Sequence, residues 1–183
     1  DDTRTLIYPV QKENLSAQLT AIAEETSLPI AILDAEVKAE KSEITTFFTT
    51  DKRIYILGLG AEPTSHQIIK AFRTLIFRHK AKLGNRVGVS LKNCPSDWIE
   101  FVVNGIELGR YEFGLYKSEP KAAIPLFENG TLELRTDDFK SELIEKGKHI
   151  ADTQLRLFTL LNAPSNFKTP QTLASWAMHS GER

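Results

Sequence analysis

Cysteine is nearly absent from this sequence, and a long hydrophobic run is missing altogether. The single Cys94 among 183 residues excludes a disulfide scaffold and any zinc or iron–sulfur site built from several thiolates, and it is typical of a reducing compartment. No segment approaches the roughly 18 to 20 consecutive apolar residues that span a bilayer. The N-terminal segment does not show the basic-then-apolar plan of a secretory signal. We therefore expect a soluble protein with no membrane partner.

Net charge is also nearly absent. Lysine and arginine together number 23 and aspartate and glutamate 24, which gives a net charge of −1 at pH 7. This balance does not indicate a protein dedicated to nucleic acids or membrane surfaces, although a local basic patch stays open. Apolar residues make up 41% and charged residues 26%, as in an ordinary globular protein. The length fits one large domain, or one domain with an appendage.

β-Branched and aromatic residues mark the expected strands. We predict strands over residues 4–10, 43–49, 53–57 and 85–91, with the second and third paired around a turn at 50–52. Because Pro9 has no N–H to donate, we expect the first strand to end at a sheet edge. Residues 28–33 fit either a short buried strand or a turn. The Glu-Asn-Gly turn at 128–130 predicts a hairpin between strands over 123–127 and 131–135.

Apolar residues at helical spacing mark the expected helices, over residues 15–26, 65–82, 98–106 and 139–161. Ser16 and the segment 136–138 are the expected N-terminal caps of the first and last of these helices. Strands that alternate with helices predict an α/β protein. We expect three layers, a mixed and mostly parallel sheet flanked by helices, followed by a long C-terminal helix.

Gly58 and Gly60 are the first candidates for a binding site. They lie between an expected strand and an expected helix, where α/β proteins place phosphate-binding turns. The dinucleotide fingerprint needs a third glycine at position 63, where this sequence has proline. Two interpretations stay open: a tight strand-to-helix turn, which the residues favour, and the rim of a ligand pocket.

Residues suited to metal or nucleophilic chemistry are scattered. The four histidines are isolated from one another: His66, His79, His149 and His179. They form none of the spacings that bind metals. Cys94 precedes Pro95 at a helix entry, where a helix dipole stabilises a thiolate. The sequence offers no histidine to activate this thiol, so a structural cysteine is favoured. We expect no catalytic residue and no cofactor in this chain.

The densest positive feature lies between residues 70 and 86, on the second predicted helix and its exit. It consists of Arg73, Arg78, Lys80, Lys82 and Arg86. Such a row can contact nucleic-acid phosphates. A solvated helix face explains the same residues, and the balanced charge of the chain favours that explanation.

Three stretches resemble the leucyl aminopeptidase family, in the family's order. The most specific is LLNAPSNFKTP at residues 160–170, followed by Leu173 and Ala174. Its characteristic members are Asn162, Pro164, Asn166, Thr169 and Pro170. The segments VNGIELGRYEFGLYKS at 103–118 and RIYILGLG at 53–60 resemble two further family stretches. The resemblance therefore covers nearly the whole chain.

The resemblance implies a non-catalytic α/β domain at the amino-terminal end of a longer enzyme. In the family, two divalent metal ions (zinc or manganese) and the catalytic lysine and arginine belong to a second, C-terminal domain. We therefore expect an α/β domain over residues 1–138, a linker helix over 139–162, and a junction with the first helix of a truncated catalytic domain over 163–183. The parent is expected to be a cytoplasmic, hexameric metallo-exopeptidase that removes N-terminal residues from peptides. This chain would pack on its own catalytic domain and on sister subunits.

One departure from the family concerns Phe158 and Thr159. Family members usually carry an Arg-Asp pair at these aligned positions. An apolar ring and a hydroxyl here imply a junction that packs differently, or a parent with altered activity.

Two other hypotheses accompany the main one. The first is a nucleic-acid-binding module that uses the basic helix 70–86. The second is a small-molecule site, because the family's domain is similar to the macro fold that binds ADP-ribose, with Gly58 and Gly60 at its rim.

The C-terminal tail after Asn162 carries a further expectation. Leu173, Trp176 and Ala177 share one face of the expected last helix, and each large side chain gains about 1.5 to 3 kcal/mol when buried. Because Pro164 and Pro170 stiffen the connector, we predict that the tail packs on another copy of the chain or is poorly ordered, and that it does not fold back on its own core.

Overall fold

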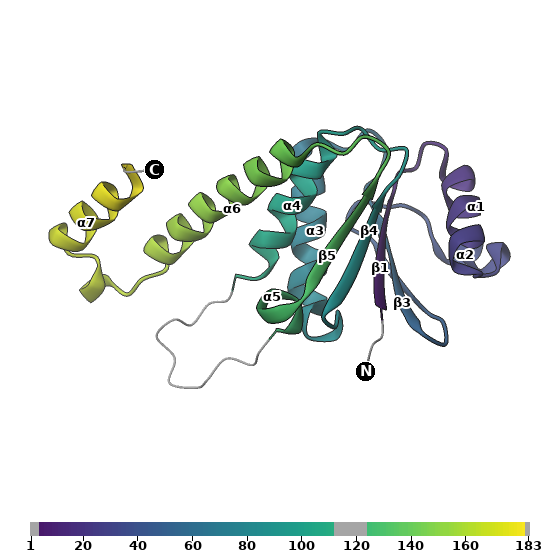
Figure 1. Cartoon of the computed structure of the whole chain (residues 1–183), viewed down its shortest axis with the longest axis horizontal. Helices are drawn as coiled ribbons and strands as arrows, with labels where there is room; N and C mark the ends of the chain where they lie inside the picture. Colours follow the sequence, from purple (N-terminus) through teal and green to yellow (C-terminus); the bar gives the residue numbers. More distant parts are fainter. Residues whose placement is uncertain (1–3, 112–123, 182–183) are drawn as a thin grey trace.

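The computed structural model describes residues 4–111 and 124–181, which form a five-stranded sheet with helices on both faces (Figure 1). The strands are β1 (Arg4–Val10), β2 (Ile44–Phe48), β3 (Lys52–Gly58), β4 (Arg86–Leu91) and β5 (Thr131–Thr136). Their order across the sheet is β2-β3-β1-β4-β5. Only β2 is antiparallel to its neighbour, so the predicted mixed and mostly parallel sheet is confirmed.

The helices divide between the two faces of this sheet. The helices α1 (Leu15–Thr26) and α2 (Ile30–Glu36) cover one face, and α3 (Ser65–His79) and α4 (Trp98–Gly109) cover the other. The remaining elements are α5 (Pro125–Asn129), α6 (Ser141–Leu161), α7 (Pro170–Gly181) and the 3₁₀ turns η1 (Lys80–Lys82) and η2 (Ser165–Phe167). This three-layer arrangement is the predicted α/β architecture.

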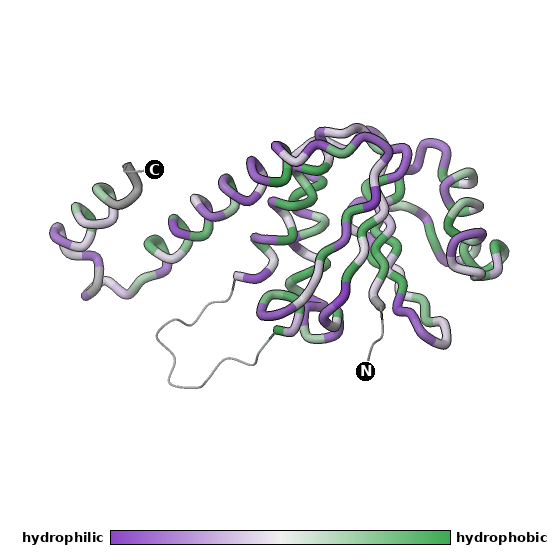
Figure 2. Tube along the Cα trace, in the orientation of Figure 1, coloured by the Kyte–Doolittle hydropathy of each residue, from purple (hydrophilic) through white to green (hydrophobic). Residues whose placement is uncertain are grey.

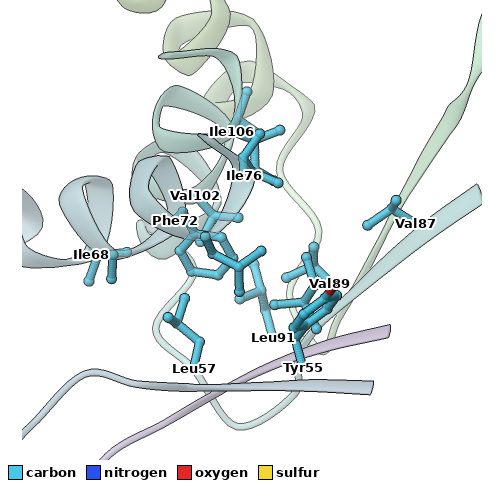
Figure 3. Packing of buried hydrophobic residues seen from close by; sticks show 14 of the residues in the cluster. Tyr55, Leu57, Ile68, Phe72, Ile76, Val87, Val89, Leu91, Val102 and Ile106 are labelled. Atoms are coloured by element: carbon cyan, nitrogen blue, oxygen red, sulfur yellow. The ribbon is translucent and has the colours of Figure 1, made fainter. Parts of the chain in front are cut away.

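The core lies on both sides of the sheet because β3 is apolar on both faces. Tyr55 and Leu57 point toward α3 and α4, where they join Phe72 in one cluster (Figure 3). Ile54 and Ile56 point the other way and pack against α1 and α2. Near-continuous apolar runs of this kind are typical of strands buried on both faces. Figure 2 shows the same division, with hydrophobic residues concentrated in the strands and on the inner sides of the helices.

Pro9 lies in a central strand, so the predicted edge position is wrong. The strand β1 pairs with β3 along its whole length, but with β4 only from Thr5 to Ile7. Pro9 therefore stands where the β4 ladder has already ended, and its missing N–H costs no hydrogen bond there.

The predicted hairpin around residues 128–130 is also wrong. Residues 125–129 form the short helix α5, which begins at Pro125, and β5 pairs in parallel with β4. Residue 123 lies outside the described residues. The Thr131 N–H donates to the carbonyl of Asn85, 2.7 Å away, and this bond starts the β4–β5 pair. The Asn-Gly signal was overridden because β4 offered a longer ladder than a two-strand hairpin.

Three other local expectations also needed tertiary contacts to be decided. Residues 28–33, left open between strand and turn, enter the helix α2, which buries Leu33 fully. At α1, Asn14 occupies the N-cap in place of the predicted Ser16, and no side chain caps the helix. At α6, the side chain of Asp137 accepts a hydrogen bond from the Asn93 N–H at 2.6 Å, and the helix starts only at Ser141.

The helix α6 leaves the domain at one end (Figure 1). Its first half packs on α4 through Gly147 and through Ala151, which is fully buried. Lys146 adds an ion pair with Glu100 of α4 at 2.8 Å. The second half runs past the sheet and carries α7, which lies apart from the α/β core.

Candidate functional site

A hollow of the domain lies between β1 and β4. The two strands part after Ile7 and Val89, and the chain then leaves β1 for α1 on one face and β4 for α4 on the other. This divergence is a topological switch point, the place where open α/β sheets bind ligands. A cleft of about 800 Å³ opens there between residues 8–25 and 90–94, and we call it the switch-point cleft. Its volume is that of a small-molecule site.

The charges around the switch-point cleft are mainly negative. Glu13, Glu24 and Glu25 line it, against one lysine, Lys92. Glu25 is held by Arg135 at 2.5 Å and by Lys92 at 3.5 Å. Because the lining carries more carboxylates than ammonium groups, it repels a diphosphate and favours a neutral or cationic molecule.

The wall formed by the loop after β1 is fixed by one side chain. The Gln18 side-chain amide donates to the carbonyls of Gln11 and Glu13, at 3.1 and 2.7 Å, and accepts a hydrogen bond from the Gln11 N–H at 3.0 Å. These bonds tie the loop to α1 and hold this side of the cleft in one shape.

Cys94 is one of the residues that line the switch-point cleft. Burial, with a smaller contribution from nearby Asp137, raises the pKa of its thiol to about 11. The thiol is therefore protonated at neutral pH, and the helix-entry position does not make it a nucleophile.

We expect Cys94 to react slowly with alkylating reagents. At pH 8 a thiol with a pKa of about 11 in place of 9.0 is ionised about 100-fold less, so iodoacetamide should modify the folded chain about 100-fold more slowly than the urea-unfolded chain. The rate should rise about tenfold per pH unit between pH 8 and 10. Mass spectrometry of timed samples measures both rates, and equal rates in folded and unfolded chain would contradict the assigned pKa.

The Gly58-Leu59-Gly60 turn ends β3, and other residues of the same chain occupy the space beside it. The Gly60 N–H donates to the carbonyl of Ala39 at 2.9 Å, and the Leu59 N–H donates to Val10 at 2.9 Å. A Cβ at Gly58 would collide with the Glu40 carbonyl, and Gly60 has a φ of +80°. The close approach of residues 39 and 40 thus requires glycine at position 58, and the left-handed backbone favours glycine at position 60. The switch-point cleft is lined instead by residues between 8 and 25 and between 90 and 94, and the ligand role of the two glycines stays a prediction.

Two of the basic residues between 70 and 86 lie on different sides of the helix α3. Arg73 and Arg78 lie about 140° apart around α3, given about 100° per residue. The guanidinium of Arg73 lies 5.3 Å from the ring centre of Phe158, and the Lys80 ammonium lies 4.9 Å from that of Phe77. Lys82 and Arg86 follow the helix and are exposed. The nucleic-acid hypothesis stays a prediction.

The family junction forms a compact turn between α6 and α7. The Thr169 hydroxyl accepts a hydrogen bond from the Thr172 N–H at 3.2 Å, and Pro170 is the first residue of α7, as the sequence predicts for a capped helix start. Asn162 donates to the Tyr111 hydroxyl at 3.1 Å. Pro164 and Asn166 are exposed. Of the predicted family stretch 103–118, residues 112–118 lie outside the described residues.

The two departures from the family pattern have local partners. The Phe158 ring packs edge-on against Tyr111, with ring centres 5.6 Å apart, and under Arg73. The Thr159 hydroxyl donates to the Leu155 carbonyl at 2.9 Å within α6. An aromatic and cation–π cluster therefore occupies the place of the usual charged pair.

Within residues 4–111 and 124–181 no three His, Cys, Asp or Glu side chains converge as they would around a metal ion. No described helix is both long and apolar enough to cross a membrane.

Comparison with known proteins points to one family. Residues 7–120 match the N-terminal domain of the cytosol aminopeptidase family. A probable cytosol aminopeptidase of Chloroherpeton thalassium is 24% identical over 205 residues, which cover 96% of this chain and 40% of that protein. Another, from Cyanothece sp., is 28% identical over 170 residues, which cover 89% of this chain and 34% of that protein. The chain thus spans well under half the length of these relatives.

Solved structures share the fold. A tomato leucine aminopeptidase variant superposes with a TM-score of 0.72 at 19% identity, over 98% of this chain and 39% of that one. The bottromycin maturation enzyme BotP, in complex with Mn, gives a TM-score of 0.66 at 14% identity, over 97% and 36%. Since the family match covers more than half of the 183 residues, this chain belongs to the cytosol aminopeptidase family and represents its N-terminal domain.

Proposed function

We propose that this chain is the non-catalytic amino-terminal part of a metal-dependent aminopeptidase, and that α6 and α7 form the arm that docks it on the catalytic part. The observation that carries this proposal is the uncovered apolar surface of the arm. The cytoplasmic location and hexameric assembly implied by the resemblance belong to the same proposal.

The arm is held on the domain along α6 and leaves several apolar side chains uncovered toward its far end. The first half of α6 is held on α4 by Gly147 and Ala151, whereas Leu157 and Leu161 in its last turns are 41% and 59% exposed. On α7, Leu173 and Met178 are 42% and 62% exposed. Large apolar side chains gathered at one end of a molecule mark an interaction surface.

The partner that best fits this surface is the remainder of the longer protein. The relatives extend well beyond the matched part, and the arm carries the family junction. The described residues form no metal site, so the two divalent ions expected of the parent would be held by its catalytic part. In this arrangement the α/β domain positions the catalytic part, and the catalytic part hydrolyses the peptide bond. Self-association through α7 stays an alternative outcome.

A direct test is turnover by the 183-residue chain. We expect no release of p-nitroaniline from leucine-p-nitroanilide with Mn²⁺ or Zn²⁺, and no stoichiometric metal retained after dialysis. Metal-dependent turnover by the pure chain would overturn the proposal.

A second test uses the protein encoded by the complete reading frame. Leu161→Lys combined with Leu173→Lys should lower its thermal stability and its metal-dependent activity, because two charges would enter the docked surface. Gln171→Lys, on an exposed position of the same helix, is the matched control and should change neither. A reading frame without a metal-ligand cluster beyond the junction, or equal behaviour of both variants, would contradict the docking role.

A further inference from the structure

The strand β2 is an edge strand that the described structure leaves open. It is last in the sheet order, and each of its residues from Ile44 to Phe48 is at least partly exposed. The Thr49 N–H donates to Lys52 and the Gly58 N–H donates to Glu43, so the odd-numbered positions face β3. The backbone groups of Ile44, Thr46 and Phe48 therefore point away from the sheet. Among the described residues no hydrogen bond reaches them.

The opposite edge is protected in a way that β2 is not. The edge strand β5 carries Glu133 and Arg135, and charges on an edge discourage pairing with another chain. Between Ile44 and Phe48 there is no charge and no proline. Phe48 is 66% exposed, and its ring is contacted on one face by Arg53, at 5.4 Å. The edge is thus apolar, β-branched and aromatic, a composition that favours strand pairing.

We propose that β2 pairs with β2 of a second copy of this chain, antiparallel about a two-fold axis at Thr46. In this register Thr46 faces Thr46 of the other copy, and Ile44 faces Phe48 at both ends. The outward N–H and C=O groups of these residues then find partners in antiparallel geometry. Two five-stranded sheets would become one continuous sheet.

The side chains are complementary in this register. Ile44 packs with the cluster beneath α3, and Phe48 lies on the same face of β2, so each Ile44 would cover an exposed Phe48. An isologous contact of this kind closes after two copies.

The arm does not compete with this surface. Helices α6 and α7 extend on the β5 side of the sheet, and β3 and its neighbour β2 lie on the other side (Figure 1). The pairing therefore does not depend on the proposed function.

Cross-linking tests the axis directly. In a hydrogen-bonded antiparallel pair the two Cα atoms lie about 5.5 Å apart, within disulfide reach. Thr46→Cys, in a Cys94→Ala background, should form a symmetric covalent dimer under mild oxidation. Thr45→Cys is the matched control: the two copies of position 45 would lie on a diagonal, beyond the about 7 Å limit for a disulfide. Equal cross-linking of both variants would overturn the register.

Sedimentation equilibrium tests the association itself. The unmodified chain should show a monomer–dimer equilibrium between about 1 µM and 1 mM, the range of weak contacts. Thr46→Pro removes an outward N–H and spares the ladder to β3, and Phe48→Lys adds a charge; each should weaken dimerisation at least tenfold. Phe139 lies elsewhere on the surface and its ring is 62% exposed, so Phe139→Lys should leave dimerisation unchanged. Circular dichroism confirms folding of each variant. A monomer at all concentrations, or a dimer that all three variants leave unchanged, would overturn the proposal.

Discussion

Truncating Phe72 should remove a large share of the stability of this domain. Phe72 is fully buried between the sheet and α4, and a Phe→Ala change at such a site costs about 3 to 5 kcal/mol through lost burial and the cavity left behind. The free energy of unfolding of a domain is only about 5 to 15 kcal/mol, so a marked fall in the denaturant midpoint is expected. Urea unfolding followed by circular dichroism measures it, with an unchanged slope.

Phe77 offers the matched control on the same helix. Its ring is 56% exposed and contacts the Lys80 ammonium, so Phe77→Ala should cost about 1 kcal/mol or less. Similar losses for the two variants would show that α3 does not present Phe72 to the core.

Gly147→Val should loosen α6 from the domain. A Cβ at this position would lie 2.6 Å from the Glu100 carbonyl and 3.1 Å from the Val103 Cβ, and the backbone of α4 cannot yield. Overpacking of this kind costs about 1 to 3 kcal/mol, although valine has the better helix propensity. We expect lower stability and faster amide exchange along α6, measured by hydrogen exchange with mass spectrometry.

His149→Val is the control for this substitution. His149 is exposed two residues further along α6, and histidine and valine have similar helix propensities. This variant should leave the stability nearly unchanged. If Gly147→Val behaves in the same way, α6 is not held by close contact with α4, and the arm of the proposed function would have no rigid base.

Local sequence patterns were sufficient to predict an element wherever a segment forms its own hydrogen bonds and buries one apolar face against the core. The β2–β3 hairpin is of this kind, as is α3, whose Thr64 and Gln67 form a reciprocal cap. The junction start at Thr169-Pro170 was also readable, because a capping hydroxyl and a first-turn proline act within one helical turn. The alternation of these elements was enough to predict the α/β class.

Burial and strand order could not be read in the same way. The pattern of β1 did not show that its neighbours are β3 and β4, so Pro9 looked like an edge residue. The switch-point cleft was missed for the same reason, since it exists only because α1 and α4 leave the sheet on opposite faces. The high pKa of Cys94 could not be read from its position either, because it comes from burial in the folded domain and, to a smaller extent, from Asp137, 43 positions away in the chain.

The amino-acid sequence by itself determined the α/β class, most element positions and the helix start at Thr169-Pro170, because these depend on residues close together in the chain. The tertiary structure alone decided that residues 30–36 and 125–129 are helices, that Gly58 and Gly60 serve packing, and that β2 is the open edge. In each of these cases the deciding contact joins segments far apart in sequence. A short segment with no strong preference of its own adopts whichever structure buries its apolar residues and satisfies its backbone against the neighbours that the fold provides.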